Sequence, residues 1–351
     1  MVPTATACTP SMASLATLVQ EQLGLANTFR CRVKWVHVES MGPTTKAFLS
    51  LGTFGMVVLD VTVPERPVVL AELLEGQGGM ALKHFCIDKR IVYTACGKSG
   101  LRIFTNIDTN IDEIGALVHA RCGAKCVSVQ GDIALVTFGR SGVRVLDIAN
   151  PSSPVELGGF KDDLHEARFV LLRDGWGFVS FGHAGLRILD VTNASLPTEI
   201  SAFAHGTFDA RHMALAGPLL FVAFSYGGLK VLDVSNPSCP LEVGAVAFPS
   251  YAAQCVQVLD DCVYVALGAG GLRILRFDPA QGTTFRVLGT YVRADVDVTS
   301  VHVTSDRLAF LCLRQGRLEI LDVRNPAEVD VVSVFTPDVR RLMCQQHCAV
   351  M

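Results

Sequence analysis

Five basic side chains recur at regular intervals along the chain: Lys34, Lys83, Lys125, Arg168 and Arg211. The last four are 42 or 43 residues apart, and each stands at the start of a short strand-like run. Like charges that a fold brings together repel one another unless solvent, an opposite charge or a bound anion compensates them. The five residues therefore predict a binding site for an anion, such as a carboxylate, a phosphate or an acidic peptide.

Two other environments would also accommodate these cations. Glu166 and Asp209 stand two residues before Arg168 and Arg211, and these acids could pair with the basic side chains. Alternatively, the long aliphatic stems could carry the charged groups into the solvent of a wet channel. The sequence leaves the anion site, the ion pairs and the solvated channel open.

Histidines form a second candidate set. His84 and His212 directly follow two of the basic positions and are secondary candidates for ligand binding. Four others are expected in loops on the same face: His119, His165, His183 and His205. Clustered imidazoles can bind zinc or copper, but here they come from different segments and no pair is two residues apart. We therefore expect no metal and no cofactor.

Motifs of known enzymes are scarce. Gly97-Lys98-Ser99 resembles the end of a phosphate-binding loop, but Val92 stands where that motif needs its first glycine. Two Cys-x3-Cys pairs, Cys122/Cys126 and Cys344/Cys348, have a spacing that zinc sites use, although no second close pair lies near either in sequence. We interpret these thiols as separate residues and assign no catalytic residue.

Composition excludes several classes of protein. The 351 residues carry a net charge of −3, so bulk charge does not favour nucleic acid or an anionic membrane. Mean hydropathy is high, at +0.39. However, glycine and proline interrupt the two longest uncharged runs, 213–229 and 243–259, so we expect no spanning helix. The start of the chain lacks a basic segment and a clear apolar core, and the 12 cysteines are widely spread, which favours the cytoplasm.

An internal repeat must position the candidate residues. Similar segments begin at residues 55, 100, 142, 185, 228, 271 and 317, with spacings of 45, 42, 43, 43, 43 and 46 residues. The clearest copies are Gly142–Pro154, Gly185–Pro197 and Gly228–Pro240. A fixed period of this length is typical of repeat architectures, so the chain contains seven equivalent units.

Each unit contains four strand signals. Around Gly185 these are Ala167–Leu172, Trp176–Phe181, Leu186–Val191 and Thr198–Ala204, separated by turn residues. About 43 residues with four short strands indicate an all-β fold, a seven-bladed β-propeller of four-stranded antiparallel blades. The basic residues then lie at equivalent starts of the innermost strands, with Gln254 and Thr299 at the two remaining positions. Lys34 fits this pattern if the first unit has a longer turn at Ser40–Thr45. We expect the basic residues near one mouth of the central channel.

Most units share a turn motif. An Asp-x-x-Asn-Pro sequence is complete at residues 147–151, 233–237 and 322–326, and Asn and Asp side chains stabilise such turns. The glycine-to-proline units resemble LVIVD-repeat proteins, which are β-propellers. The resemblance covers roughly Arg30 to Pro337. It implies the fold and no shared catalytic motif.

The expected organisation has three parts. Residues 1–29 form an N-terminal extension, residues 30–337 the propeller, and residues 338–351 a C-terminal tail. The ring could close through the strand Val329–Phe335. Alternatively, Leu15–Leu25 could add a strand across the seam or form a short helix.

The leading functional hypothesis is a non-enzymatic protein-interaction scaffold with protein partners, which binds an acidic peptide or a small anion at the basic mouth. The alternative is a lyase, hydrolase or metal-dependent oxidase that acts on an anionic small molecule there, with a histidine for acid–base chemistry. A third possibility is a subunit of a larger complex, with exposed apolar outer strands. A channel blocked by Trp35 or Phe169, with acids near the cations, favours the scaffold.

Overall fold

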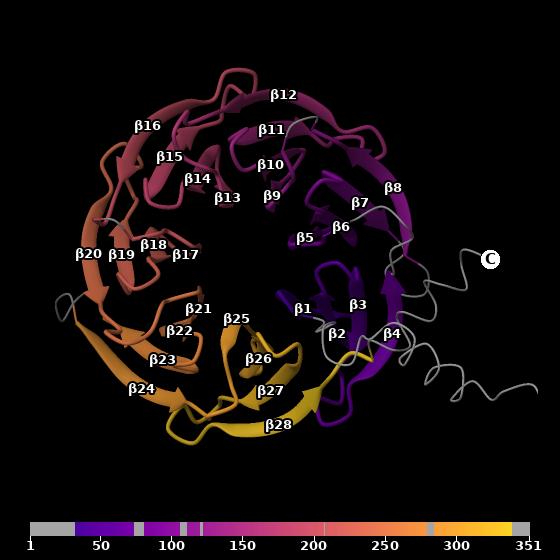
Figure 1. Cartoon of the computed structure of the whole chain (residues 1–351), viewed down its shortest axis with the longest axis vertical. Helices are drawn as coiled ribbons and strands as arrows, with labels where there is room; N and C mark the ends of the chain where they lie inside the picture. The colour runs from indigo at the N-terminus through magenta and orange to yellow at the C-terminus, as the bar shows by residue number, and fades with distance from the viewer. Residues whose placement is uncertain are drawn as a thin grey trace, which may run out of the picture. The chain divides into compact units, whose positions relative to one another are not determined.

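The computed structural model describes residues 32–73, 81–105, 111–119, 122–206, 208–278 and 284–338. Within these ranges it contains 28 strands and no helix, arranged as seven four-stranded sheets around a ring (Figure 1). The prediction of a seven-bladed β-propeller is confirmed. No segment of the described ranges forms a helix long and apolar enough to span a membrane.

Every blade is built from four consecutive strands, counted from the channel outward. The first four blades contain β1 (Trp35–Met41), β2 (Thr44–Ser50), β3 (Met56–Asp60), β4 (Val68–Leu73); β5 (His84–Asp88), β6 (Ile91–Ala95), β7 (Leu101–Thr105), β8 (Asp112–Leu117); β9 (Cys126–Gln130), β10 (Ile133–Thr137), β11 (Val143–Asp147), β12 (Val155–Phe160); β13 (Phe169–Arg173), β14 (Trp176–Ser180), β15 (Leu186–Asp190) and β16 (Thr198–Phe203). The last three contain β17 (His212–Ala216), β18 (Leu219–Ala223), β19 (Leu229–Asp233), β20 (Leu241–Val246); β21 (Cys255–Leu259), β22 (Cys262–Ala266), β23 (Leu272–Phe277), β24 (Phe285–Tyr291); β25 (Val298–Val303), β26 (Leu308–Leu313), β27 (Leu318–Asp322) and β28 (Asp330–Phe335).

The sequence located the strands closely, with one difference in blade one. The predicted strands around Gly185 differ from β13–β16 by at most two residues at each end. In blade one we expected a long turn at Ser40–Thr45, but β1 continues to Met41 and β2 begins at Thr44. The turn is tight because Gly42 adopts a φ of 68°, which glycine reaches at no steric cost.

Among the described residues, no strand is exchanged between the two ends of the ring. β28 pairs with β27 of its own blade, from Leu318↔Phe335 to Asp322↔Asp330. The C-terminal strand therefore completes blade seven, and blade one has four strands of its own. Residues Leu15–Leu25, the N-terminal extension and Cys344/Cys348 lie outside the described residues, and the expected domain boundaries stay predictions.

The repeated turns form through local hydrogen bonds. In the motif at Asp147, Oδ1 of Asp147 accepts the Ala149 N–H at 2.9 Å, and Oδ1 of Asn150 accepts the Ser152 N–H at 3.2 Å. The hairpin glycine that begins each unit has a steric role too. A Cβ on Gly142 would lie 2.1 Å from the Phe160 carbonyl oxygen, at a φ of 80°. Any side chain there would clash with the end of the fourth strand where it pairs with the third.

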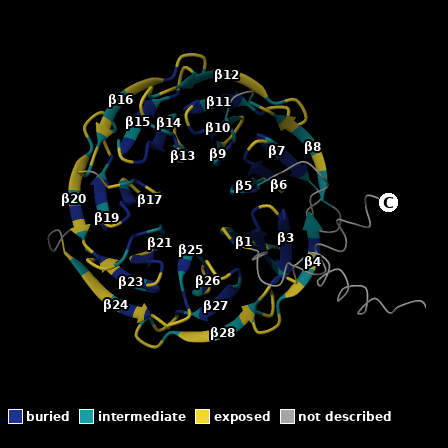
Figure 2. Ribbon diagram, in the orientation of Figure 1, coloured by how far each residue is buried: buried dark blue, intermediate teal, exposed yellow. Residues whose placement is uncertain are grey.

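The core lies between the blades. The middle strands are almost wholly buried, whereas the outer strands alternate with exposed positions (Figure 2). Neighbouring blades cover both faces of each sheet, which accounts for the high mean hydropathy without a membrane. Exposed apolar residues on outer strands are spread over five blades: Val68, Val155, Leu241, Val287 and Val331.

Candidate functional site

The five basic residues occupy equivalent places in five blades. Each directly precedes its inner strand, and each backbone N–H donates to the carbonyl of the residue that ends the second strand of the same blade, as Lys125 does to Thr137 at 2.8 Å. The preceding residue pairs with the hairpin of the previous blade, as Ala167 does with Gly139. This repeated backbone geometry places the five side chains, here called the basic ring, at one end of the channel. Its members are Lys34, Lys83, Lys125, Arg168 and Arg211.

Hairpin glycines provide room for the basic ring. A Cβ on Gly139 would lie 3.1 Å from Cε of Lys125, and a Cβ on Gly182 would lie 3.4 Å from Cζ of Arg168. Four cationic side chains thus extend across the glycine hairpin of their own blade, whereas Ser225 stands at this hairpin position in the blade of Arg211.

Acids of the next blade pair with two members of the ring. Lys125 Nζ lies 2.6 Å from Glu166 Oε2, and Arg168 Nη1 lies 3.0 Å from Asp209 Oδ2. Both acids precede the next ring residue by two positions, as the sequence suggested. The hydrogen bond from Lys125 is the main cause that holds the pKa of Glu166 below its usual range, and burial opposes it.

Three members of the ring have no such acid. The positions that correspond to Glu166 are Ala81, Gly123 and Ala252. Within the described part of the chain, no carboxylate pairs with Lys34, Lys83 or Arg211, and Arg211 Nη1 instead donates to the Gln254 side chain. The basic ring therefore keeps an excess of positive charge in blades one, two and five.

The pKa values of two lysines in the basic ring reflect the crowding of positive charge. Burial, followed by the charges of Lys125 and Lys34, lowers the pKa of Lys83. Burial, followed by the charge of Arg32, lowers the pKa of Lys34. The protonated, charged form of both side chains is thus less stable than it would be in water, and a bound anion would stabilise it.

The two kinds of ring residue predict opposite effects on stability. Lys83→Gln removes an uncompensated charge, so we expect the melting temperature at low salt to stay equal or to rise. Glu166→Gln removes the partner of Lys125, and we expect a loss of about 1 kcal/mol in the free energy of unfolding. Thermal and urea unfolding at two salt concentrations measure both effects. A clear destabilisation by Lys83→Gln would show that Lys83 has a stabilising partner.

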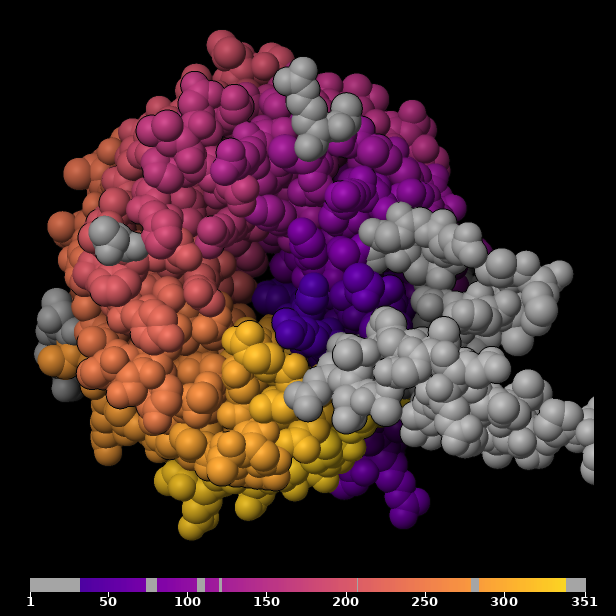
Figure 3. Space-filling view, viewed as in Figure 1, coloured from indigo at the N-terminus to yellow at the C-terminus, as the bar shows by residue number. Residues whose placement is uncertain are grey.

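An aromatic cluster fills the channel next to the ring. It consists of the first residues of four inner strands, Trp35, His84, Phe169 and His212. The ring centroids of Trp35 lie 4.5 Å from His84 and 5.2 Å from His212, and Phe169 lies 4.3 Å from His212. The space-filling view shows a hollow at the centre of one face with atoms of the N-terminal blade at its floor (Figure 3). The cluster matches the blocked channel that favours the scaffold hypothesis.

The channel histidines are neutral. Burial lowers the pKa of His84 and of His212 to about 3. Their Nδ1 atoms accept backbone N–H groups of the next inner strand, from Val127 at 3.5 Å and Val256 at 3.4 Å. Imidazoles with so low a pKa are poor acid–base catalysts near pH 7.

Sequence reasoning missed a second pair of channel histidines. The rings of His37 in β1 and His302 in β25 lie 4.9 Å apart. Burial lowers the pKa of His37 to about 4 and that of His302 to about 3. Alternation along the inner strand was the available signal, since His37 is two residues after Trp35 and points to the same side.

Two of the four loop histidines contact acids, whereas His119 and His205 lie against phenylalanine rings. His165 Nδ1 lies 3.0 Å from Asp162 Oδ1, and His183 Nδ1 lies 3.1 Å from Asp209 Oδ1. In the described ranges no group of three or more His, Cys, Asp or Glu residues could hold a metal ion. Cys126 is buried with its thiol directed at the Val170 carbonyl.

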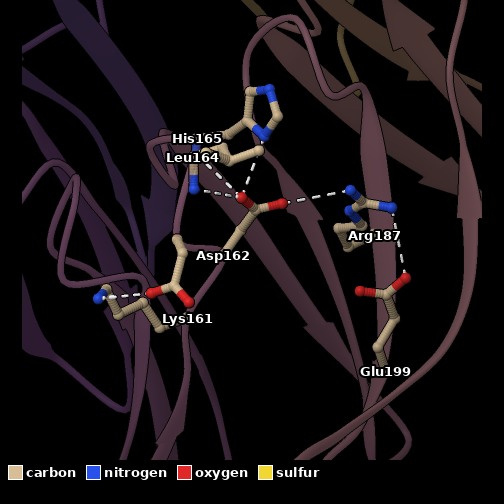
Figure 4. Close-up of polar contacts among 7 residues, drawn as sticks. Lys161, Asp162, Leu164, His165, Arg187 and Glu199 are labelled. Atoms are coloured by element: carbon tan, nitrogen blue, oxygen red, sulfur yellow. Dashed lines mark hydrogen bonds and ion pairs between the residues drawn. The ribbon is translucent and has the colours of Figure 1, made fainter.

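A repeated ion pair within the blades was also missed. Basic residues of the third strand pair with glutamates of the fourth, 11 or 12 residues later: Arg102–Glu113, Arg144–Glu156, Arg187–Glu199 and Lys230–Glu242. Figure 4 shows Arg187 between Glu199 of its own blade and Asp162 of the preceding connection, at 3.3 and 3.2 Å. The spacing of 11 or 12 residues was the signal for these pairs, which join the third and fourth strands of one blade.

The LVIVD-repeat family model matches three segments, residues 123–162, 166–204 and 209–247. These segments are units of the seven-fold ring described above. Three of the seven units therefore match the LVIVD-repeat model. The matched units supply Lys125, Arg168 and Arg211, and the resemblance inferred from the sequence is confirmed.

Solved structures of other proteins have a similar propeller fold. The RRP9 WD40 repeats are 9% identical over 82% of this chain and 89% of theirs, with a TM-score of 0.65. A chain of the mitotic checkpoint complex is 11% identical over 91% of this chain and 96% of its own, with a TM-score of 0.63. The computationally designed Ika8 protein is 11% identical over 88% of both chains, with a TM-score of 0.62. No curated protein sequence matches the chain.

Proposed function

We propose that this LVIVD-repeat propeller is a non-enzymatic interaction scaffold that binds an acidic segment of a partner protein at its basic ring. The observation that carries the proposal is the uncompensated charge of Lys34, Lys83 and Arg211 beside two ring members that already have acids. An extended acidic segment can reach several blades at once, because the three cations lie in blades one, two and five.

The closed channel supports binding rather than catalysis. Trp35 and Phe169 occupy the channel next to the ring, and the histidines behind them are buried and neutral. A ligand at the mouth would therefore meet cations without an adjacent acid–base group from the channel. The enzyme alternative has no specific observation in its favour.

The related structures point the same way. One solved relative carries WD40 repeats and another is part of a mitotic checkpoint complex. At 9% and 11% identity they share only the fold with this chain, so the partner and the cytoplasmic location stay predictions.

Titration with hexaglutamate tests the proposed site. We expect the purified full chain to bind this peptide at low salt, with a dissociation constant that rises steeply with salt because each ion pair is screened. The double variant Lys34→Gln/Lys83→Gln should weaken binding at least about tenfold, because it removes two of the three uncompensated charges. Isothermal titration calorimetry measures both.

The control removes the same charge elsewhere. Lys89→Gln/Arg286→Gln changes a turn after β5 and the outer strand β24, both away from the ring. Equal weakening by the two double variants would indicate a general charge effect and contradict the site. Binding of inorganic phosphate but not of hexaglutamate would replace the acidic segment with a small anion.

A further inference from the structure

The only exposed aromatic side chains among the described residues lie together on the face of the basic ring. Phe208 is 38% exposed and belongs to the connection between blades four and five, and Tyr226 is 61% exposed in the hairpin between β18 and β19. All other exposed large apolar residues of the described part are valine or leucine. Two exposed aromatics at one blade junction therefore require an explanation.

The backbone holds the two aromatics close to each other. A Cβ on Gly227 would lie 2.8 Å from Cδ2 of Phe208, so Phe208 packs on the residue that follows Tyr226. Asp209, the next residue after Phe208, pairs with Arg168. Phe208 is therefore anchored on both sides, which lowers the entropy lost when a partner binds.

Arg211 provides charge at the same junction. The backbone N–H of Arg211 donates to the Ala223 carbonyl. Ser225 occupies the hairpin position next to Arg211 that Gly182 occupies next to Arg168. Tyr226 is the next residue along that hairpin. The guanidinium donates to the neutral Gln254 amide and keeps its charge for a ligand.

We propose that Phe208, Tyr226 and Arg211 bind a short partner segment with a bulky apolar residue next to an acidic one. This inference rests on the proposed function and names the sequence that the partner needs. The apolar side chain packs between the two aromatic rings, and the carboxylate pairs with Arg211. Aromatic residues and arginine dominate the binding energy of protein interfaces, since each combines large contact area with few freely rotating bonds.

A display library of random twelve-residue peptides, selected on the full chain, tests this requirement. We expect selected peptides to combine acidic residues with Phe, Tyr, Trp or Leu at a constant spacing. Fluorescence anisotropy then measures each peptide and two relatives, one with Ala at the apolar position and one with Asn or Gln at the acidic positions.

Variants connect the peptide to the three residues. Tyr226→Ser should weaken the parent peptide at least about tenfold and leave the Ala peptide unaffected. Arg211→Gln should weaken binding of the parent peptide to the same extent and leave binding of the Asn/Gln peptide unaffected. Leu241→Ser is the matched control, because Leu241 is 63% exposed on the outer strand β20. Thermal unfolding checks that each variant is folded.

The outcomes separate this inference from the proposed function. Peptides that depend on Lys34 and Lys83 but bind Tyr226→Ser and Arg211→Gln normally would overturn the inference and leave the acidic-segment scaffold intact. Peptides without acidic preference would overturn both, as would a selection that yields no binding peptide. Coupled losses at Tyr226 and Arg211 support both.

Discussion

Acidification from pH 7 to pH 5 is expected to lower the free energy of unfolding by several kcal/mol. Four histidines with lowered pKa values cause this effect: His84, His212 and His302 with a pKa of about 3, and His37 with a pKa of about 4. Unfolding returns each imidazole to its ordinary pKa of 6.5. Each residue then contributes roughly 2 kcal/mol over this range.

The sign follows from proton binding. Between pH 6.5 and the folded pKa values, the unfolded chain binds protons that the folded chain excludes. Stability is therefore complete above about pH 6.5 and is lost as the pH falls toward 3. The physical cause is burial, because a charged imidazole in the channel would lose its hydration.

Urea unfolding between pH 4.5 and 7.5 measures this dependence. His84→Gln and His302→Gln should each reduce the slope of the free energy of unfolding against pH by the equivalent of about one proton. The reason is that glutamine stays neutral and can still accept a backbone N–H. His183→Gln is the control, since the His183 side chain is 68% exposed in a hairpin. A slope unchanged by both buried substitutions would contradict this origin of the pH dependence.

Glu319→Ala is expected to cost about 1 to 3 kcal/mol, as the loss of the partner of a buried polar group does. The Glu319 side chain is 1% exposed and accepts the Tyr291 hydroxyl at 2.7 Å. Its other oxygen lies 3.7 Å from both Arg293 and Arg317. Without the carboxylate, the Tyr291 hydroxyl loses its acceptor, and the two guanidinium groups keep Asp295 as their acidic partner.

The same chain suggests a rescue. Asp162 and Arg187 pair between one blade and the connection before it (Figure 4). Arg293 and Glu319 pair in the same way at blade seven, at nearly the same sequence spacing, but with the acid and the base exchanged. Arg293→Asp/Glu319→Arg should therefore recover more than half of the stability lost by Glu319→Ala. Urea unfolding measures this recovery. If the double variant loses as much free energy of unfolding as its two single changes added together, the two junctions are not interchangeable.

Most of the fold could be predicted because its signals are local. The regular spacing of Gly142, Gly185 and Gly228 set the blade period, and turn residues such as Asp147 and Asn150 bond to backbone only two residues away. Where a turn depends on one residue, as at Gly42, the prediction was less accurate. A single left-handed glycine shortened a turn that we expected to be long.

The sequence by itself determined seven blades and five cations at equivalent starts of the inner strands, because a repeated chain puts equal residues at equal places. Only the tertiary structure decided which cations have acids. Glu166 is 41 residues from Lys125, and contacts between blades bring them together. The neutral histidines likewise depend on burial, which all seven blades create together. The site is therefore an uneven ring, with free charge where alanine or glycine replaces an acid.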